Sequence, residues 1–126
     1  MEESERIRCR MAACHEAPVG VNDWNFYLIN DGDAPLDSAV LYRVSTEWGD
    51  FGHTRGADVR VADLAPGAHA LIWRDDGEFR IELSVLVRVG GREVRLSFEF
   101  PKLYIQRNLR HVDGLGKLGW EESAEG

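Results

Sequence analysis

The chain has 126 residues, a length that fits one domain with a single hydrophobic core. Hydrophobic residues make up 44% of the sequence and charged residues 29%, which excludes a chain that is disordered throughout. The formal net charge of -7 at pH 7 makes nucleic acid an unfavourable partner, because the average surface repels a phosphate backbone.

Period-two alternation predicts the first strands. Over residues 5–14, Ile7, Cys9 and Met11 share one face, and arginines occupy the other. The segment 24–29 is apolar on both faces, which is typical of a central strand, and 30–35 is a turn. Further strands are predicted over 38–47, 59–61 and 68–73, with turns at 63–67 and 75–77.

The longest alternation runs from Phe79 to Val89 and resumes from Val94 to Phe100. Gly90 and Gly91 between the two runs are suited to a two-residue hairpin turn, because glycine tolerates positive φ. A shift of one residue would bury charged side chains, so we expect a fixed register.

About seven strands, with no helix before residue 101, predict an all-β fold. We expect an immunoglobulin-like antiparallel β-sandwich over residues 1–100, followed by a C-terminal arm over 101–126. The arm carries Ile105, Leu109 and Val112 at the spacing of a short helix, and its acidic end, 121–126, is expected to be disordered.

The order of these signals resembles bacterial immunoglobulin-like modules of the CARDB (cell-adhesion-related) and fibronectin-like type. The resemblance rests on the strand that passes into a turn at 28–32, the turn at 63–67 and the long final hairpin. It covers about residues 5–100. It implies a sandwich with a binding or spacing role, and it carries over no functional residue.

The two cysteines, Cys9 and Cys14, predict reduced thiols. On one extended strand their Cα atoms would lie about 16 Å apart, too far for a disulfide. The sequence has no apolar run suited to a signal peptide or a membrane span, so we expect a cytoplasmic protein without membrane contact. The high ratio of arginine to lysine suggests a GC-rich bacterial genome.

Metal binding, cofactor chemistry and catalysis have little support. The four histidines are scattered, and the cysteines lack the spacing of zinc ligands. No nucleophile elbow, phosphate-binding glycine loop or zinc-protease motif occurs. We therefore expect a protein that is not an enzyme and that holds no cofactor or metal.

Loop aromatics form a candidate ligand site. Trp48 and Phe51, with Trp73, offer rings for stacking on a sugar, while Asp50 and His53 offer polar contacts. The alternative, which we favour, is that Trp48 closes the end of the sandwich as part of the core.

The C-terminal arm is the first candidate for a partner-binding site. It is more apolar than a solvated linker, and the residues concerned are Leu103, Tyr104, Leu109, Leu115, Leu118 and Trp120. The arm either folds back over its own domain or docks on another protein or a second copy, which would give a homodimer. The leading hypothesis is a non-catalytic interaction or assembly module, and the alternative is a carbohydrate- or small-ligand-binding sandwich.

Overall fold

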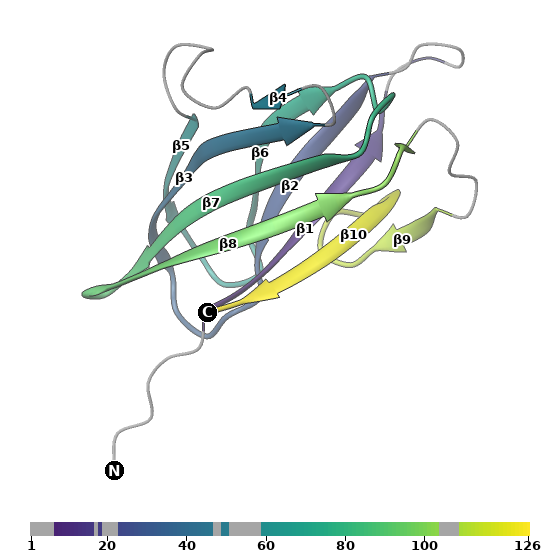
Figure 1. Cartoon of the computed structure of the whole chain (residues 1–126). Helices are drawn as coiled ribbons and strands as arrows, with labels where there is room; N and C mark the ends of the chain where they lie inside the picture. Colours follow the sequence, from purple (N-terminus) through teal and green to yellow (C-terminus); the bar gives the residue numbers. More distant parts are fainter. Residues whose placement is uncertain (1–6, 17, 19–22, 47–48, 51–58, 104–108) are drawn as a thin grey trace.

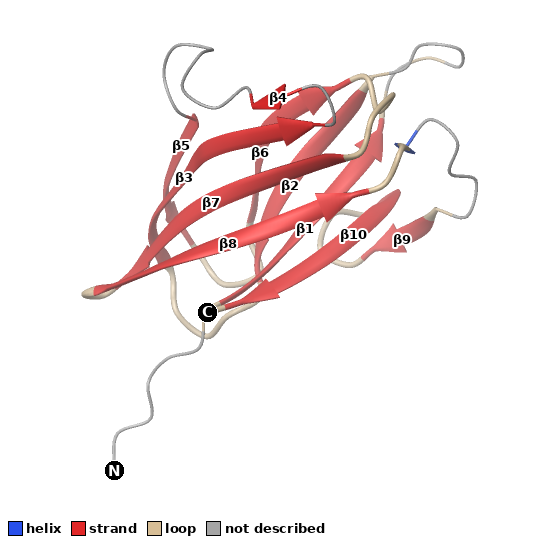
Figure 2. Cartoon of the chain, in the orientation of Figure 1, coloured by secondary structure: helices blue, strands red, loops and turns tan. Residues whose placement is uncertain are grey.

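The computed structural model describes residues 7–16, 18, 23–46, 49–50, 59–103 and 109–126. These residues form two antiparallel β-sheets that face each other, and they contain no α-helix (Figures 1 and 2). The all-β sandwich predicted from the sequence is confirmed.

The first sheet contains both the early and the last strands of the chain. Its order is β6 (His69–Asp75), β2 (Trp24–Asn30), β1 (Arg8–His15), β10 (Lys117–Glu125) and β9 (Arg110–Val112). The second sheet has the order β4 (Gly49–Asp50), β3 (Leu36–Thr46), β7 (Ile81–Val89) and β8 (Arg92–Phe100), and β5 (Val59–Leu64) also pairs with β3. All these neighbours are antiparallel.

The predicted β7–β8 hairpin is confirmed, with its register unbroken from Val89↔Arg92 to Ile81↔Phe100. Gly90 in its turn has a φ of 60°, a conformation that glycine adopts without strain. Because one face of both strands is buried, the alternation of apolar and polar residues determines which residues oppose each other.

The main core lies between the two sheets. The inward residues of β1 and β2 meet those of β7 and β8, and Phe26 packs edge-to-face on Phe100 with ring centroids 5.1 Å apart. Cys9 and Met11 belong to this core, as the alternation of the first strand predicted.

Two predictions for the C-terminal arm are wrong. Its acidic end is strand β10, which inserts between β1 and β9, and Val112 belongs to β9 rather than to a helix. Residue Ile105 of the predicted helical stripe lies outside the described residues. The sandwich therefore extends past residue 100, since β10 pairs with β1 from Cys14↔Gly119 to Arg8↔Glu125. The acidic residues fit this strand because it runs beside the arginines of β1.

A second, smaller apolar cluster lies on the outer face of the first sheet. It contains Ala12, Cys14, Tyr27, Ile29 and Val112, and Leu115 packs against it. Leu115 lies in the 113–116 turn, and Arg10 donates a hydrogen bond of 3.0 Å to the Asp113 carbonyl. The β9–β10 turn thus covers part of this face, in agreement with the interpretation that the arm folds back on its own domain.

Asn30, at the end of β2, is fully buried and connects three turns. Its Nδ2 donates hydrogen bonds of 2.9 Å to the carbonyls of Ala34 and Leu64, and its Oδ1 accepts one from the Gly32 amide. Its own main-chain carbonyl accepts a bond of 2.7 Å from Gly67. One side chain thereby supplies hydrogen-bond partners to one buried and two partly buried main-chain groups.

Candidate functional site

Most described residues of the predicted partner-binding arm pack into the domain itself. Leu103 is fully buried, and its amide donates a 3.0 Å hydrogen bond to the Gly77 carbonyl. Leu109 and Trp120 pack against the main core, and Leu115 packs against the second cluster. Tyr104 lies outside the described residues.

Leu118 is the exception, because 58% of its surface is exposed. It lies on β10 opposite His111 of β9, on the strand face that also carries Trp120. Among the described residues, the other large apolar side chain that is exposed is Leu71, at 40%, on the edge strand β6 at the opposite side of the same sheet.

The predicted ligand loop is only partly described. Trp48, Phe51 and His53 lie outside the described residues, and Asp50 belongs to β4, where it pairs with Ser45. Trp73 lies in the other sheet and is partly buried against the main core, and its buried indole N–H has no hydrogen-bond partner among the described residues. Part of its ring surface therefore packs against the core, on the sheet that does not carry Asp50.

A polar cluster that the sequence did not reveal joins three segments on the outer face of the first sheet. Lys117 Nζ donates to Glu16 Oε2 at 2.6 Å and to the Tyr27 hydroxyl at 3.0 Å. The Tyr27 hydroxyl also donates to Glu16, as does Asn25 Nδ2 at 2.9 Å. No sequence motif signals this cluster, because its members come from distant segments.

The electrostatics of this cluster suit a structural clamp. Burial alone would raise the pKa of Glu16, but the hydrogen bonds from Lys117, Tyr27 and Asn25 outweigh it and lower the pKa to about 2. The bonds to Glu16 and Tyr27 raise the pKa of Lys117. Near neutral pH, Glu16 stays ionised and Lys117 stays protonated, so neither is poised to transfer a proton.

A second ionic cluster is centred on Arg10 of β1. Its guanidinium binds both carboxylate oxygens of Asp31, at 2.6 and 3.2 Å, and Glu121 at 3.0 Å. The hydrogen bonds that Arg10 donates to Asp31 are the main cause that raises the pKa of Arg10. This cluster ties β1 to β10 and to the turn that follows β2.

Both cysteines are buried and free, and they lie on the single strand β1, as the sequence predicted. Burial is the main cause that raises the pKa of Cys9 to about 12 and that of Cys14 to about 11. Both therefore remain thiols at neutral pH and are poor nucleophiles.

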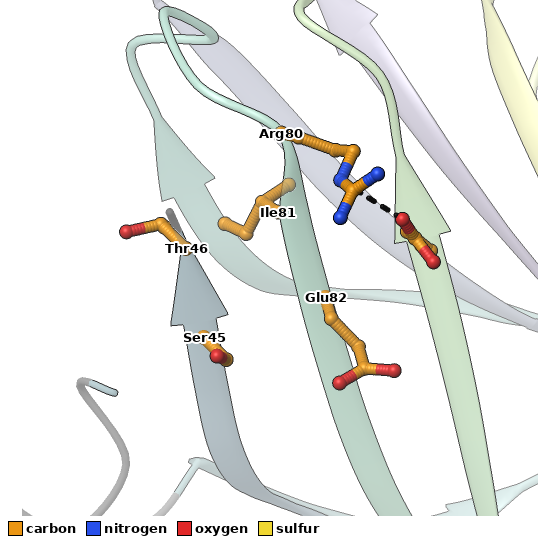
Figure 3. A pocket seen from close by; sticks show the side chains of 6 residues that line it. Ser45, Thr46, Arg80, Ile81 and Glu82 are labelled. Atoms are coloured by element: carbon orange, nitrogen blue, oxygen red, sulfur yellow. Dashed lines mark ion pairs between the residues drawn. The ribbon is translucent and has the colours of Figure 1, made fainter. Parts of the chain in front are cut away.

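A hollow of about 240 Å³ opens at one end of the second sheet (Figure 3). It is lined by Ser45, Thr46, Arg80, Ile81, Glu82 and Glu99. Arg80 Nε and Glu99 Oε2 form an ion pair at 3.0 Å, drawn as the dashed line in Figure 3. Sequence analysis did not select these residues, because they become neighbours only through strand pairing.

Within the described ranges, no group of three or more histidine, cysteine, aspartate or glutamate side chains could hold a metal ion. In the same part of the chain, no helix has the length and apolar character needed to cross a membrane. No family model, no curated protein and no solved structure matches the chain.

Proposed function

We propose that this chain is a non-catalytic protein-interaction module that associates with a second copy of itself through the β9–β10 hairpin. The observation that carries the proposal is the exposure of Leu118, in a segment whose other described apolar residues pack into the domain. A single exposed leucine is common on protein surfaces. This one, however, lies one strand away from the edge of the sheet, where main-chain groups are open to pairing.

The hairpin offers a self-complementary contact. In the described part of the chain, β9 pairs with β10 alone. Antiparallel pairing of β9 with β9 of a second copy, centred on His111, would join the two five-stranded sheets into one. His111 and Leu118 of both copies would then lie in one row on the same face. The same patch serves both partners, as a two-fold interface requires.

The size of this contact sets its strength. A three-residue edge and one exposed leucine bury far less than the roughly 1,600 Å² of a standard stable interface, so we expect a dissociation constant of about 100 μM or weaker. The net charge of -7 adds repulsion between copies. Since salt screens that repulsion, association should strengthen as ionic strength rises.

The role also agrees with the resemblance to CARDB and fibronectin-like modules, which implies binding or spacing. Two buried free thiols are compatible with a reducing compartment, and we propose the cytoplasm.

Sedimentation velocity over about 10 μM to 1 mM tests the proposal across the expected affinity range. The wild type should show a mass that rises with concentration, and Leu118→Ser should abolish the rise without changing the melting temperature. Leu71→Ser is the matched control, because it removes an exposed leucine at the opposite edge of the same sheet. A wild type that stays monomeric throughout, or equal effects of both substitutions, would show that the hairpin is not the interface.

A further inference from the structure

We propose that the hollow shown in Figure 3 binds one unit of a polyhydroxylated ligand, such as a single sugar ring. It lies where β3 ends, β7 begins and β8 ends. Strand register places Ser45 opposite Glu82 and Glu82 opposite Glu99, so the three side chains form one row across three strands. Arg80 precedes β7 and forms an ion pair with Glu99 at one end of this row.

Two polar side chains of this row lack a partner in the described part of the chain. Arg80 pairs with Glu99, whereas the Glu82 carboxylate and the Ser45 hydroxyl form no hydrogen bond or ion pair there. Glu82 also lies directly opposite a second carboxylate, an arrangement that destabilises a β-sheet. A ligand that donates a hydrogen bond to Glu82 would relieve this unfavourable pairing.

The mixture of donors and acceptors selects the class of ligand. Glu82 and Glu99 accept hydrogen bonds, Arg80 donates them, and the hydroxyl of Ser45 does both. An ammonium group would only donate and would be repelled by Arg80, while a phosphate or carboxylate would meet two glutamates. Hydroxyl groups donate and accept at the same atom, so a polyol can donate to Glu82 and exchange hydrogen bonds with the Ser45 hydroxyl.

The volume of the hollow limits the size of the ligand. At about 240 Å³ it lies below the roughly 300–1,000 Å³ of sites for drug-sized molecules, so it suits one ring or a short polyol. The site is shallow and polar, with little apolar surface to bury, and we therefore expect a dissociation constant of about 1–10 mM.

Amide chemical shifts measured by two-dimensional ¹⁵N–¹H NMR provide the test. Glucose, galactose, mannose and N-acetylglucosamine are titrated separately, with methylammonium and inorganic phosphate at matched ionic strength as the other two ligand classes. At least one sugar should give saturable shifts at Ser45, Glu82 and Glu99. Glu82→Gln should weaken that binding about fivefold or more, because a hydrogen bond to a charged group is stronger than one between neutral groups.

Glu93→Gln is the matched control, because it neutralises another carboxylate of the second sheet, one that pairs with Arg88 outside the hollow. It should leave the sugar affinity unchanged. The proposal is overturned if no sugar gives saturable shifts, if Glu82→Gln binds as tightly as the wild type, or if methylammonium or phosphate binds instead. Leu118→Ser should bind the sugar as tightly as the wild type does. A negative result for sugar binding would therefore leave the proposed self-association untouched, and the reverse also holds.

Discussion

Replacement of Asn30 tests whether one buried amide holds together the turns at one end of the sandwich. In Asn30→Ala, three side-chain hydrogen bonds are lost: a buried one to the Leu64 carbonyl, and partly buried ones to the Ala34 carbonyl and from the Gly32 amide. At about 1 kcal/mol for each bond, the free energy of unfolding should fall by about 3 kcal/mol.

Asn30→Asp is the sharper perturbation, because it preserves the volume and the bond from Gly32. It replaces the donating Nδ2 by an oxygen that faces two carbonyl oxygens at 2.9 Å. Ionisation is then disfavoured, so the pKa of the new carboxyl in the folded state should rise above its unfolded value of about 3.9. The folded state binds the proton more tightly, so the stability of this variant should decrease as pH rises through the folded pKa.

Urea unfolding followed by tryptophan fluorescence at pH 4, 5.5 and 7 measures both effects. The free energy of unfolding of Asn30→Ala should lie below that of the wild type by the same amount at every pH. That of Asn30→Asp should be lowered by at least as much at pH 7, and by less at pH 4. If Asn30→Asp stays within about 0.5 kcal/mol of wild type at pH 7, or parallels Asn30→Ala at every pH, the reasoning is refuted.

Three further outcomes follow from the same contacts. A chain ending at Phe100 lacks β10 and should be unfolded by circular dichroism; a cooperative thermal transition would contradict this. The stability difference between wild type and Glu16→Gln should be about 0.5–1 kcal/mol near neutral pH, since the pair with Lys117 is partly exposed, and it should vanish as pH falls from about 4.5 to 2. Cys9 and Cys14 should react with a thiol reagent only after denaturation, and rapid labelling of the native protein would contradict their burial.

The strands of the core were predictable because burial of one face imposes a period of two. Ile81 to Phe100 and Ile7 to Met11 show this pattern clearly, and the structure places their apolar faces between the sheets. Residues 24–29 were apolar on both faces, and the structure gives the reason: Phe26 and Leu28 face the main core, while Tyr27 and Ile29 face the second cluster.

The last strand was missed because its pattern depends on a neighbour that is distant in sequence. Glycines and acidic residues at 114–126 are typical of a solvated tail, but Glu121 lies beside Arg10 of β1 and binds it. The clamp of Glu16 and Lys117 and the hollow between β3, β7 and β8 likewise arise only from pairing. Local periodicity carries no information about such contacts. For this reason the sequence predicted the whole arm as the partner-binding segment and could not single out Leu118.

The pairing of β1 with β10 has a consequence for biosynthesis. Arg10 and Glu121, which bind each other across this pair, are 111 residues apart, so β1 leaves the ribosome long before its second neighbour exists. Until then one edge of β1 is open along Ala12, Ala13 and Cys14, which have no charge to discourage pairing with another nascent chain. The first sheet can close only after β10 has been synthesised, and the high contact order of this closure predicts slow folding.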